Sequence, residues 1–306
     1  MSLRVLGLDG GGTKTLVAVA GPSGHVNLVT GGGVDPTAGD GWEGRLAALV
    51  AGLGPVDAAV LGLPYFSEVP AISARQVALA ARVFGHGAQV RNDVDVAFEG
   101  ALAGADGVLI LAGTGSMAWG RGPRGVRRCG GFGDVFGDEG SAYWIGREAL
   151  ALVSRQLDGR VRAADFAGGI LAALGVAGAG LIDWTYGQPH PRAAIAGLAV
   201  VVAGLADGGN REARALLARA ALQLAALARG AGWRRGDNWS YAGGVLGNAT
   251  LRGMVAARLG CDPVAPVLPP VGGAVLVAAQ AAGWDTGPGF IQALARSLRQ
   301  AGQFKE

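Results

Sequence analysis

Two glycine-rich segments, each directly after an apolar run, contain residue types that bind phosphate. The first covers residues 10–14, Gly-Gly-Gly-Thr-Lys, and the second covers residues 113–116, Gly-Thr-Gly-Ser. Glycine lets backbone N–H groups approach an anion closely, and Thr13 and Lys14 add a hydroxyl donor and a cation. Either segment alone is equally consistent with a plain hairpin turn. Two in one chain favour polyphosphate binding, because a phosphate that is transferred needs contacts from more than one side.

Acidic residues near these segments are candidates for metal binding and proton transfer. Asp9 ends the first apolar run, where its carboxylate would hold Mg²⁺, often through water. Asp93 follows a short predicted strand and precedes a helix, a position that faces the ligand crevice in α/β proteins. We predict that Asp93 accepts the proton of an attacking hydroxyl, with helix capping as its alternative role. Asp95 is the competing base, although acidic residues are also common in the first turn of a helix.

The most polar glycine-rich segment covers residues 130–145. It combines glycines with Asp134, Asp138 and Glu139 ahead of an apolar helix, which is more acidic than helix capping requires. Carboxylates accept hydrogen bonds from sugar hydroxyls, and Phe132 would cover a ring face. We therefore favour a sugar site over a structural loop. A further segment, residues 242–248, would let a flat adenine lie against backbone, although a tight turn explains it nearly as well.

Strands and turns must position these residues. Residues 4–9 and 14–20 read as two strands joined by the first glycine turn, and residues 108–111 and 117–121 repeat the pattern, which suggests a duplicated unit. A strand after the first turn excludes a Walker loop and a dinucleotide-binding fingerprint, since both need a helix there. Further strands are predicted at 58–63, 88–91 and 239–242. Helices are predicted at 42–52, 70–84, 94–103, 142–157, 163–174, 191–205, 211–231, 271–282 and 290–301, and a further helix after the 242–248 segment ends at residue 259. Alternating strands and helices indicate an α/β fold.

Composition excludes several classes of protein. The longest apolar stretch with helical character, residues 193–206, is too short to span a bilayer, and the N-terminus has no signal-peptide core, so we expect a cytoplasmic protein without a membrane partner. Cys129 and Cys261 form neither a disulfide framework nor a CxxC pair. The net charge is only +3, and the arginines at 121–128 lack interleaved aromatics, so we expect no nucleic-acid partner.

Taken together, residues 8–13, 92–93, 113–116, 131–144 and 242–247 resemble the N-acetylglucosamine kinases of the BadF/BadG/BcrA/BcrD ATPase family, within the actin/hexokinase/Hsp70 superfamily. The string Gly-Asp-Glu-Gly-Ser-Ala-Tyr-Trp at 137–144 is the most specific part. The resemblance implies two ribonuclease-H-like lobes with ATP and Mg²⁺ bound in the cleft between them. It implies an N-terminal lobe of residues 1–103, to which a C-terminal helix at 286–306 returns, and a C-terminal lobe of residues 104–285. A homodimer is also common in such kinases.

The same resemblance assigns roles to individual residues. Asp93 matches the catalytic base, and Asp9 the Mg²⁺ position. The phosphate contacts are expected at Gly11, Gly12, Thr13, Lys14, Thr114 and Gly115. Adenine or ribose is expected at Gly243, Gly244 and Asn248. The sugar contacts are expected at Asp35, Ser116, Gly131, Phe132 and Asp138.

Two positions depart from the family pattern. Asp35 stands where many relatives have a sugar-contacting Asn, and its carboxylate would favour an amine-bearing sugar such as glucosamine. Phe132 replaces a Trp of some relatives. N-acetylglucosamine 6-phosphate is the expected product, with glucosamine or another hexose as the alternative acceptor. Two other classes fit the sequence less well than a kinase. An activator ATPase of 2-hydroxyacyl-CoA dehydratases would bridge an iron–sulfur cluster through cysteines, and a sugar-sensing regulator would usually carry an added DNA-binding domain.

Overall fold

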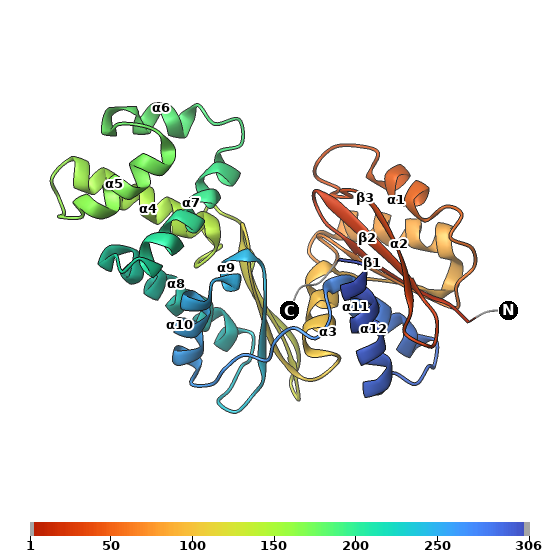
Figure 1. Cartoon of the computed structure of the whole chain (residues 1–306). Coiled ribbons are helices and arrows are strands. Elements are labelled where there is room, and N and C mark those ends of the chain that lie inside the picture. Colours follow the sequence, from red (N-terminus) through yellow and green to blue (C-terminus); the bar gives the residue numbers. More distant parts are fainter. Residues whose placement is uncertain (1–2, 303–306) are drawn as a thin grey trace. The chain divides into compact units, whose positions relative to one another are not determined.

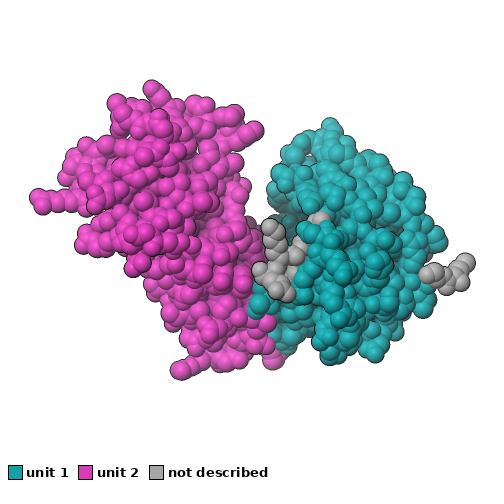
Figure 2. All heavy atoms as spheres, in the orientation of Figure 1, with its two compact units in different colours: residues 1–106, 265–306 teal, residues 107–264 magenta. Residues whose placement is uncertain are grey.

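The computed structural model describes residues 3–302, which form two compact units. Unit 1 comprises residues 1–106 and 265–306, and unit 2 comprises residues 107–264 (Figures 1 and 2). Each unit has its own mixed sheet and its own hydrophobic core. The predicted α/β class with two lobes is confirmed.

Unit 1 contains a five-stranded sheet in the order β3-β2-β1-β4-β5. Its strands are β1 (Val5–Gly10), β2 (Lys14–Ala20), β3 (Val26–Gly32), β4 (Ala58–Leu63) and β5 (Ala88–Asn92). β2 is antiparallel to both β1 and β3, whereas β1, β4 and β5 are parallel. Parallel strands end at one edge of a sheet, so Asp9 near the end of β1 and Asp93 directly after β5 share that edge.

Helices cover both faces of this sheet. They are α1 (Trp42–Val50), α2 (Pro70–Phe84), α3 (Asp93–Leu102), α11 (Pro270–Ala281) and α12 (Pro288–Gln300), with a 3₁₀ turn η1 (Gly85–Gly87). Successive strand residues point to opposite faces. Val5 therefore packs with residues of α11 and α12, while its neighbour Leu6 packs with residues of α1 and α2.

The position of α11 corrects the predicted lobe boundary. We expected residues up to 285 to belong to the second lobe, but the structure places the boundary at 264 and assigns α11 to unit 1. α11 is buried along most of its length against β1 and α3, where Gly7 and Gly273 leave no room for a Cβ beside the backbone of the partner element. A helix that is apolar on all sides is predicted to be buried, but its sequence does not say in which core.

Unit 2 contains a four-stranded sheet in the order β8-β7-β6-β9, with β6 antiparallel to β7 and parallel to β9. Its strands are β6 (Gly107–Ala112), β7 (Ser116–Gly122), β8 (Gly125–Gly130) and β9 (Trp239–Ala242). Its helices are α4 (Ala142–Leu157), α5 (Ala164–Leu174), α6 (Leu181–Tyr186), α7 (Pro191–Asp207), α8 (Arg211–Gly230), α9 (Gly244–Gly247) and α10 (Ala249–Leu259), with a 3₁₀ turn η2 (Gly178–Gly180). Its core joins α4, α5, α7, α8 and α10 to one face of the sheet.

Several elements differ from the sequence prediction. β3, β8 and α6 were not predicted, and the turn expected at residues 243–247 contains a short helix, α9, ahead of the helix that ends at residue 259 as predicted. Within residues 3–302, no single helix is long and apolar enough to cross a membrane; two sharply bent pairs, α5 with η2–α6 and α7 with α8, meet the length and composition criteria alone.

Candidate functional site

The first glycine turn, residues 10–14, lies at the end of β1 in unit 1. The turn is closed by a hydrogen bond from the Gly11 N–H to the Lys14 carbonyl (3.0 Å), and the Val34 N–H donates to the Gly11 carbonyl (3.0 Å). Gly12, Thr13 and Lys14 are exposed. The structure therefore fixes the backbone of this turn from two sides and leaves its tip open to a ligand.

Asp9 and Asp93 interact at the shared edge of the sheet. Burial, followed by the repulsive charge of Asp93, raises the pKa of Asp9 from 3.8 to about 7, while Lys14 acts in the opposite direction. A divalent cation would relieve this repulsion and favour the ionised form of Asp9. The pair thus fits a Mg²⁺ position held by Asp9, although the described residues contain no cluster of three or more His, Cys, Asp or Glu side chains suited to a metal.

The structure separates the roles of the residues around Asp93. Asn92, rather than Asp93, is the N-cap of α3, and its Oδ1 accepts from the Val94 N–H (3.0 Å). Asp93 Oδ1 also accepts from the Val94 N–H (2.9 Å). Asp95 instead forms an ion pair with Arg91 (3.2 Å). Arg91 therefore engages Asp95, and the role of Asp93 as the proton acceptor stays a prediction.

The structure brings Asp35 to the first glycine turn. Its Oδ1 accepts from both the N–H and the hydroxyl of Thr37 (2.7 Å each), and its Oδ2 would lie 3.6 Å from a Cβ at Gly12. The Tyr65 hydroxyl is 3.5 Å from the Thr37 hydroxyl. One oxygen of Asp35 therefore holds the local loop, and the other lies beside the turn that the sequence assigned to phosphate.

The loop between β4 and α2 is a part of this region that sequence analysis missed. Tyr65 and Ser67 both have φ of 64°, a conformation that is unfavourable for residues other than glycine. The buried Asn92 side chain fixes the loop, because its Nδ2 donates to the Phe66 carbonyl and to Glu68 Oε1 (3.0 Å each). Strained backbone is concentrated at functional sites. The single sequence signal for this anchor is the Asn directly before the predicted base.

The second glycine turn, residues 113–116, ends β6 in unit 2 and is enclosed by residues 130–143. The Ser116 N–H donates to Asp138 Oδ1 (3.1 Å), and the Ser116 hydroxyl donates to the Glu139 carbonyl (2.8 Å). The Gly131 N–H donates to the Ser116 carbonyl (3.0 Å). Ser116, Gly131 and Asp138, three of the predicted sugar residues, are thus brought together within one unit.

Asp138 and Phe132 lie in contrasting surroundings. Asp138 is 3% exposed at a φ of 55°, and its Oδ2 accepts from Arg192 (2.7 Å). Phe132 is 69% exposed, with the Arg128 guanidinium 5.8 Å from its ring centroid. Sequence analysis did not identify Arg192, because 54 residues separate it from Asp138. Of the two, Phe132 offers an open ring face, whereas both carboxylate oxygens of Asp138 already have protein partners.

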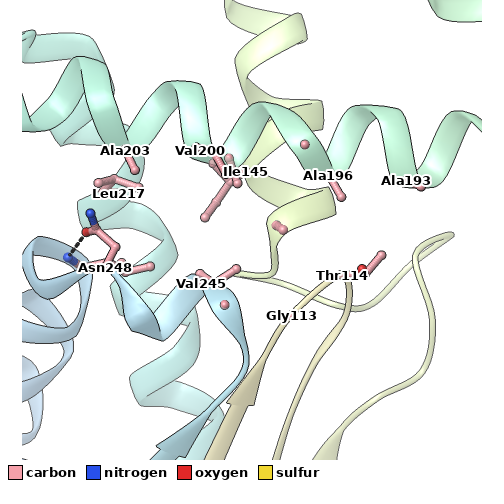
Figure 3. A pocket seen from close by; sticks show the side chains of 15 residues that line it. Gly113, Thr114, Ile145, Ala193, Ala196, Val200, Ala203, Leu217, Val245 and Asn248 are labelled. Atoms are coloured by element: carbon pink, nitrogen blue, oxygen red, sulfur yellow. Dashed lines mark hydrogen bonds between the residues drawn. The ribbon is translucent and has the colours of Figure 1, made fainter. Parts of the chain in front are cut away.

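A pocket of about 600 Å³ lies directly beside the second turn, wholly within unit 2. Figure 3 shows α7 crossing one side of it, with Val245 and Asn248 on the opposite side and Gly113 and Thr114 at one end. Its α7 wall consists of small or aliphatic residues: Ala193, Ala196, Gly197, Ala199, Val200 and Ala203. Pockets for small molecules are typically apolar with few polar groups. The size and the apolar wall of the pocket are compatible with a nucleoside, and the adjacent turn is the one predicted to bind phosphates.

The predicted adenine or ribose residues differ in how they contribute to this pocket. Gly243 (φ 90°) packs so closely on the carbonyl of Ala112 that no Cβ fits there, whereas Gly244 lines the pocket with no atom within 4 Å of a Cβ position. Asn248 lines the pocket too. Its Oδ1 caps α10 by accepting from the Leu251 N–H (2.8 Å), and its Nδ2 donates to Asp207 (3.3 Å). Both the oxygen and the nitrogen of the Asn248 side-chain amide are therefore hydrogen-bonded within the protein.

The two cysteines are both free. Burial, followed by the charge of Glu139, raises the pKa of the Cys129 thiol above its ordinary value. A thiol that resists ionisation is a poor metal ligand or nucleophile.

Known proteins resemble this chain in both sequence and fold. The model of the BadF/BadG/BcrA/BcrD ATPase family matches residues 6–278. The N-acetylmuramic acid/N-acetylglucosamine kinase of Clostridium acetobutylicum is 33% identical over 137 residues, which is 44% of this chain and 45% of that relative, so the match spans less than half of either protein.

Two solved structures are similar over nearly the whole chain. A proposed N-acetylglucosamine kinase from Chromobacterium violaceum has a TM-score of 0.72 at 26% identity and is covered over 100% of its length, with 91% of this chain covered. A proposed N-acetylglucosamine kinase from Porphyromonas gingivalis has a TM-score of 0.64 at 18% identity, with 96% of this chain and 99% of that one covered, and this likeness shows the fold alone.

Proposed function

Because the chain belongs to the BadF/BadG/BcrA/BcrD ATPase family, we propose that it is an ATP-dependent kinase that phosphorylates an amino sugar. The observation that carries this proposal is the position of Asp9 and Asp93 at one edge of the sheet, beside the first glycine turn, where their charges repel each other. A metal-binding carboxylate and a separate basic carboxylate next to a phosphate turn are what phosphoryl transfer to a hydroxyl requires.

Each unit carries part of the proposed chemistry. In unit 1, Asp93 accepts the proton of the sugar hydroxyl while that oxygen bonds to the γ-phosphorus and the bond to the β,γ-bridging oxygen breaks, which releases ADP. The N–H groups of Gly11 and Gly12, the Thr13 hydroxyl and the Lys14 ammonium bind phosphate oxygens. Asp9 would hold Mg²⁺, which would supply charge neutralisation at the β- and γ-phosphates. In unit 2, the pocket beside α7 holds the nucleoside, and Thr114 and Gly115 bind its phosphates.

For the acceptor we propose N-acetylglucosamine, phosphorylated at its 6-hydroxyl, with glucosamine as the alternative. The names of the similar proteins support the first, and Asp35 beside the first turn supports the second. An ionised carboxylate attracts the ammonium group of glucosamine but gains no charge interaction from an acetamide. Ser116, Gly131 and the open face of Phe132 would contact the sugar ring, and Asp138 would orient Ser116.

A coupled assay of ADP release tests the proposal. N-acetylglucosamine, glucosamine, N-acetylmuramic acid and glucose are each added to the protein with ATP and Mg²⁺, and we expect one of the amino sugars to raise ADP release well above the rate with ATP alone. Asp93→Asn should lower kcat by about 10²- to 10⁴-fold, the usual contribution of a general base. Asp95→Asn is the matched control, two residues along the same helix, and should retain activity. No stimulation by any of the four sugars, or full activity of Asp93→Asn, would refute the proposal.

A further inference from the structure

Arg192 lies at a junction between the pocket and the loop around the second glycine turn. It is the second residue of α7, and the residues that follow it, Ala193 and Ala196 among them, form the pocket wall. The backbones of α7 and α4 are in close contact, because a Cβ at Gly146 would overlap the Ile195 carbonyl. A shift of the first turn of α7 would therefore change the pocket and the start of α4 together.

The guanidinium of Arg192 holds two carboxylates of the loop. Its Nη2 donates to Asp138 Oδ2 (2.7 Å), and its Nε lies 3.4 Å from Asp134 Oδ1. The planar fork of an arginine suits such a double contact, whereas a lysine offers a point charge. Because the Asp138 side chain is 4% exposed, removing Arg192 would leave a buried carboxylate without its cation, which is strongly unfavourable.

Asp138 also contacts the second glycine turn. Its other oxygen accepts from the Ser116 N–H (3.1 Å), and a Cβ at Gly115 would lie only 2.7 Å from Asp138 Oδ2. The Ser116 carbonyl in turn accepts from the Gly131 N–H. A continuous chain of charged and polar contacts thus runs from the pocket wall through Arg192 and Asp138 to the turn and the glycine loop.

We propose that Arg192 is a positioning residue that couples nucleotide binding in the unit 2 pocket to sugar binding at Ser116, Gly131 and Phe132. The inference rests on the proposed kinase function and adds to it a route by which one substrate alters affinity for the other. A nucleotide seated against α7 holds the Arg192 guanidinium in place, which keeps Asp138 and Ser116 in the arrangement that the sugar needs. By linkage, bound sugar strengthens nucleotide binding by the same factor.

Titration calorimetry of the full chain tests the coupling. N-acetylglucosamine and glucosamine are titrated with and without a non-hydrolysable ATP analogue and Mg²⁺, and the ratio of the two dissociation constants is the readout. In the unaltered protein we expect the analogue to tighten sugar binding at least about fivefold, the lower end of usual allosteric couplings. Arg192→Gln should bring the ratio to about 1, and Arg192→Lys should give an intermediate ratio, since one ammonium cannot hold both carboxylates.

Controls separate coupling from general damage to the fold. Arg160→Gln removes an exposed arginine paired with Asp158 and should leave the ratio unchanged. Asp134→Asn keeps the contact between Arg192 and Asp138 and should lower the ratio only in part, and it serves as the test if Arg192→Gln does not fold. A merely structural role would raise the dissociation constant of the sugar equally with and without the analogue, so that their ratio would not change.

The outcomes distinguish this inference from the proposed function. An unchanged ratio in Arg192→Gln, or a ratio of 1 in the unaltered protein, would overturn the coupling while leaving a kinase intact. A protein that binds neither sugar under any condition would overturn the proposed acceptor, and the coupling with it.

Discussion

The carboxylate of Asp9 is predicted to destabilise unit 1 in the absence of metal and nucleotide. Burial and the charge of Asp93 oppose its ionisation, so the folded state binds the Asp9 proton more tightly than the unfolded state does. Asp9→Asn keeps the shape of the side chain and removes its charge. The variant should therefore be inactive as a kinase and yet more stable than the unaltered protein at neutral pH.

The sign and size of the effect follow from the two pKa values. Below pH 3.8 both states hold the proton and Asp9 carries no penalty. Between 3.8 and about 7 the unfolded state loses the proton while the folded state keeps it, so stability falls as pH rises, and above about 7 the penalty is constant. A difference of about three pKa units at 1.36 kcal/mol each gives a penalty of about 4 kcal/mol at pH 8 and about 1.5 kcal/mol at pH 5. The stabilisation by Asp9→Asn should thus grow by about 2 to 3 kcal/mol between these two pH values.

Hydrogen exchange of the amides in β1 and β4 is the suitable measurement, because it reports the opening free energy of this sheet separately from unit 2. The exchange is followed at pH 5 and pH 8 without Mg²⁺. Asp40→Asn, the same chemical change at an exposed residue, is the control and should alter stability by less than about 0.5 kcal/mol. A gain in Asp9→Asn that is equal at both pH values, or a loss of stability at pH 8, would refute the electrostatic argument.

Three further predictions concern the pocket and the acceptor. Gly197→Val places a side chain in the open space of the pocket and should raise the KM for ATP at least about tenfold in steady-state kinetics. Gly204→Val, on the same helix with equal free space but outside the pocket, should leave this KM unchanged. Equal KM values for the two variants would show that the nucleoside does not bind in this pocket. Gly243→Ala should lower the free energy of unfolding by at least about 2 kcal/mol in denaturant titrations, because Gly243 has a φ of 90° and its Cβ would overlap Ala112. Gly244→Ala should not destabilise the fold, and comparable losses in both variants would contradict the packing described for Gly243. Asp35→Asn should shift the ratio of kcat/KM values toward N-acetylglucosamine and away from glucosamine, and an unchanged ratio would show that Asp35 does not face the amino group.

Local sequence signals predicted elements well where a cap or breaker marks the end. The bounds of α2, α4, β4 and β9 agree with the prediction, and α2 begins at Pro70 because proline is favoured in the first turn of a helix. β8 was missed because Val126, Arg127 and Arg128 show no alternation of apolar and polar residues, and an edge strand needs none. The unit to which α11 belongs was not predictable either, since that depends on its contacts with β1 and α3.

The candidate site shows the same division between local and distant information. The glycine turns and Asp93 were recognisable because each is a contiguous motif at the end of a strand. The α7 wall of the pocket was not, since a run of alanines, valines and glycines is an ordinary helix sequence until another element lies opposite it. Arg192 was missed for a related reason, because its partner Asp138 is far away in the sequence.

Gly243 and Gly244 show why motif recognition alone does not assign roles. The two are adjacent and belong to one motif, yet the first is glycine because backbone fills the space where its Cβ would be, and the second leaves space that belongs to the pocket. Substitution of the first should disturb the fold, and substitution of the second should disturb ligand binding. A glycine-rich motif therefore combines structural and ligand-facing positions, and only the surroundings of each Cβ position separate them. The same criterion distinguishes Gly197 from Gly204 along α7, which makes the pocket testable with pairs of chemically identical substitutions.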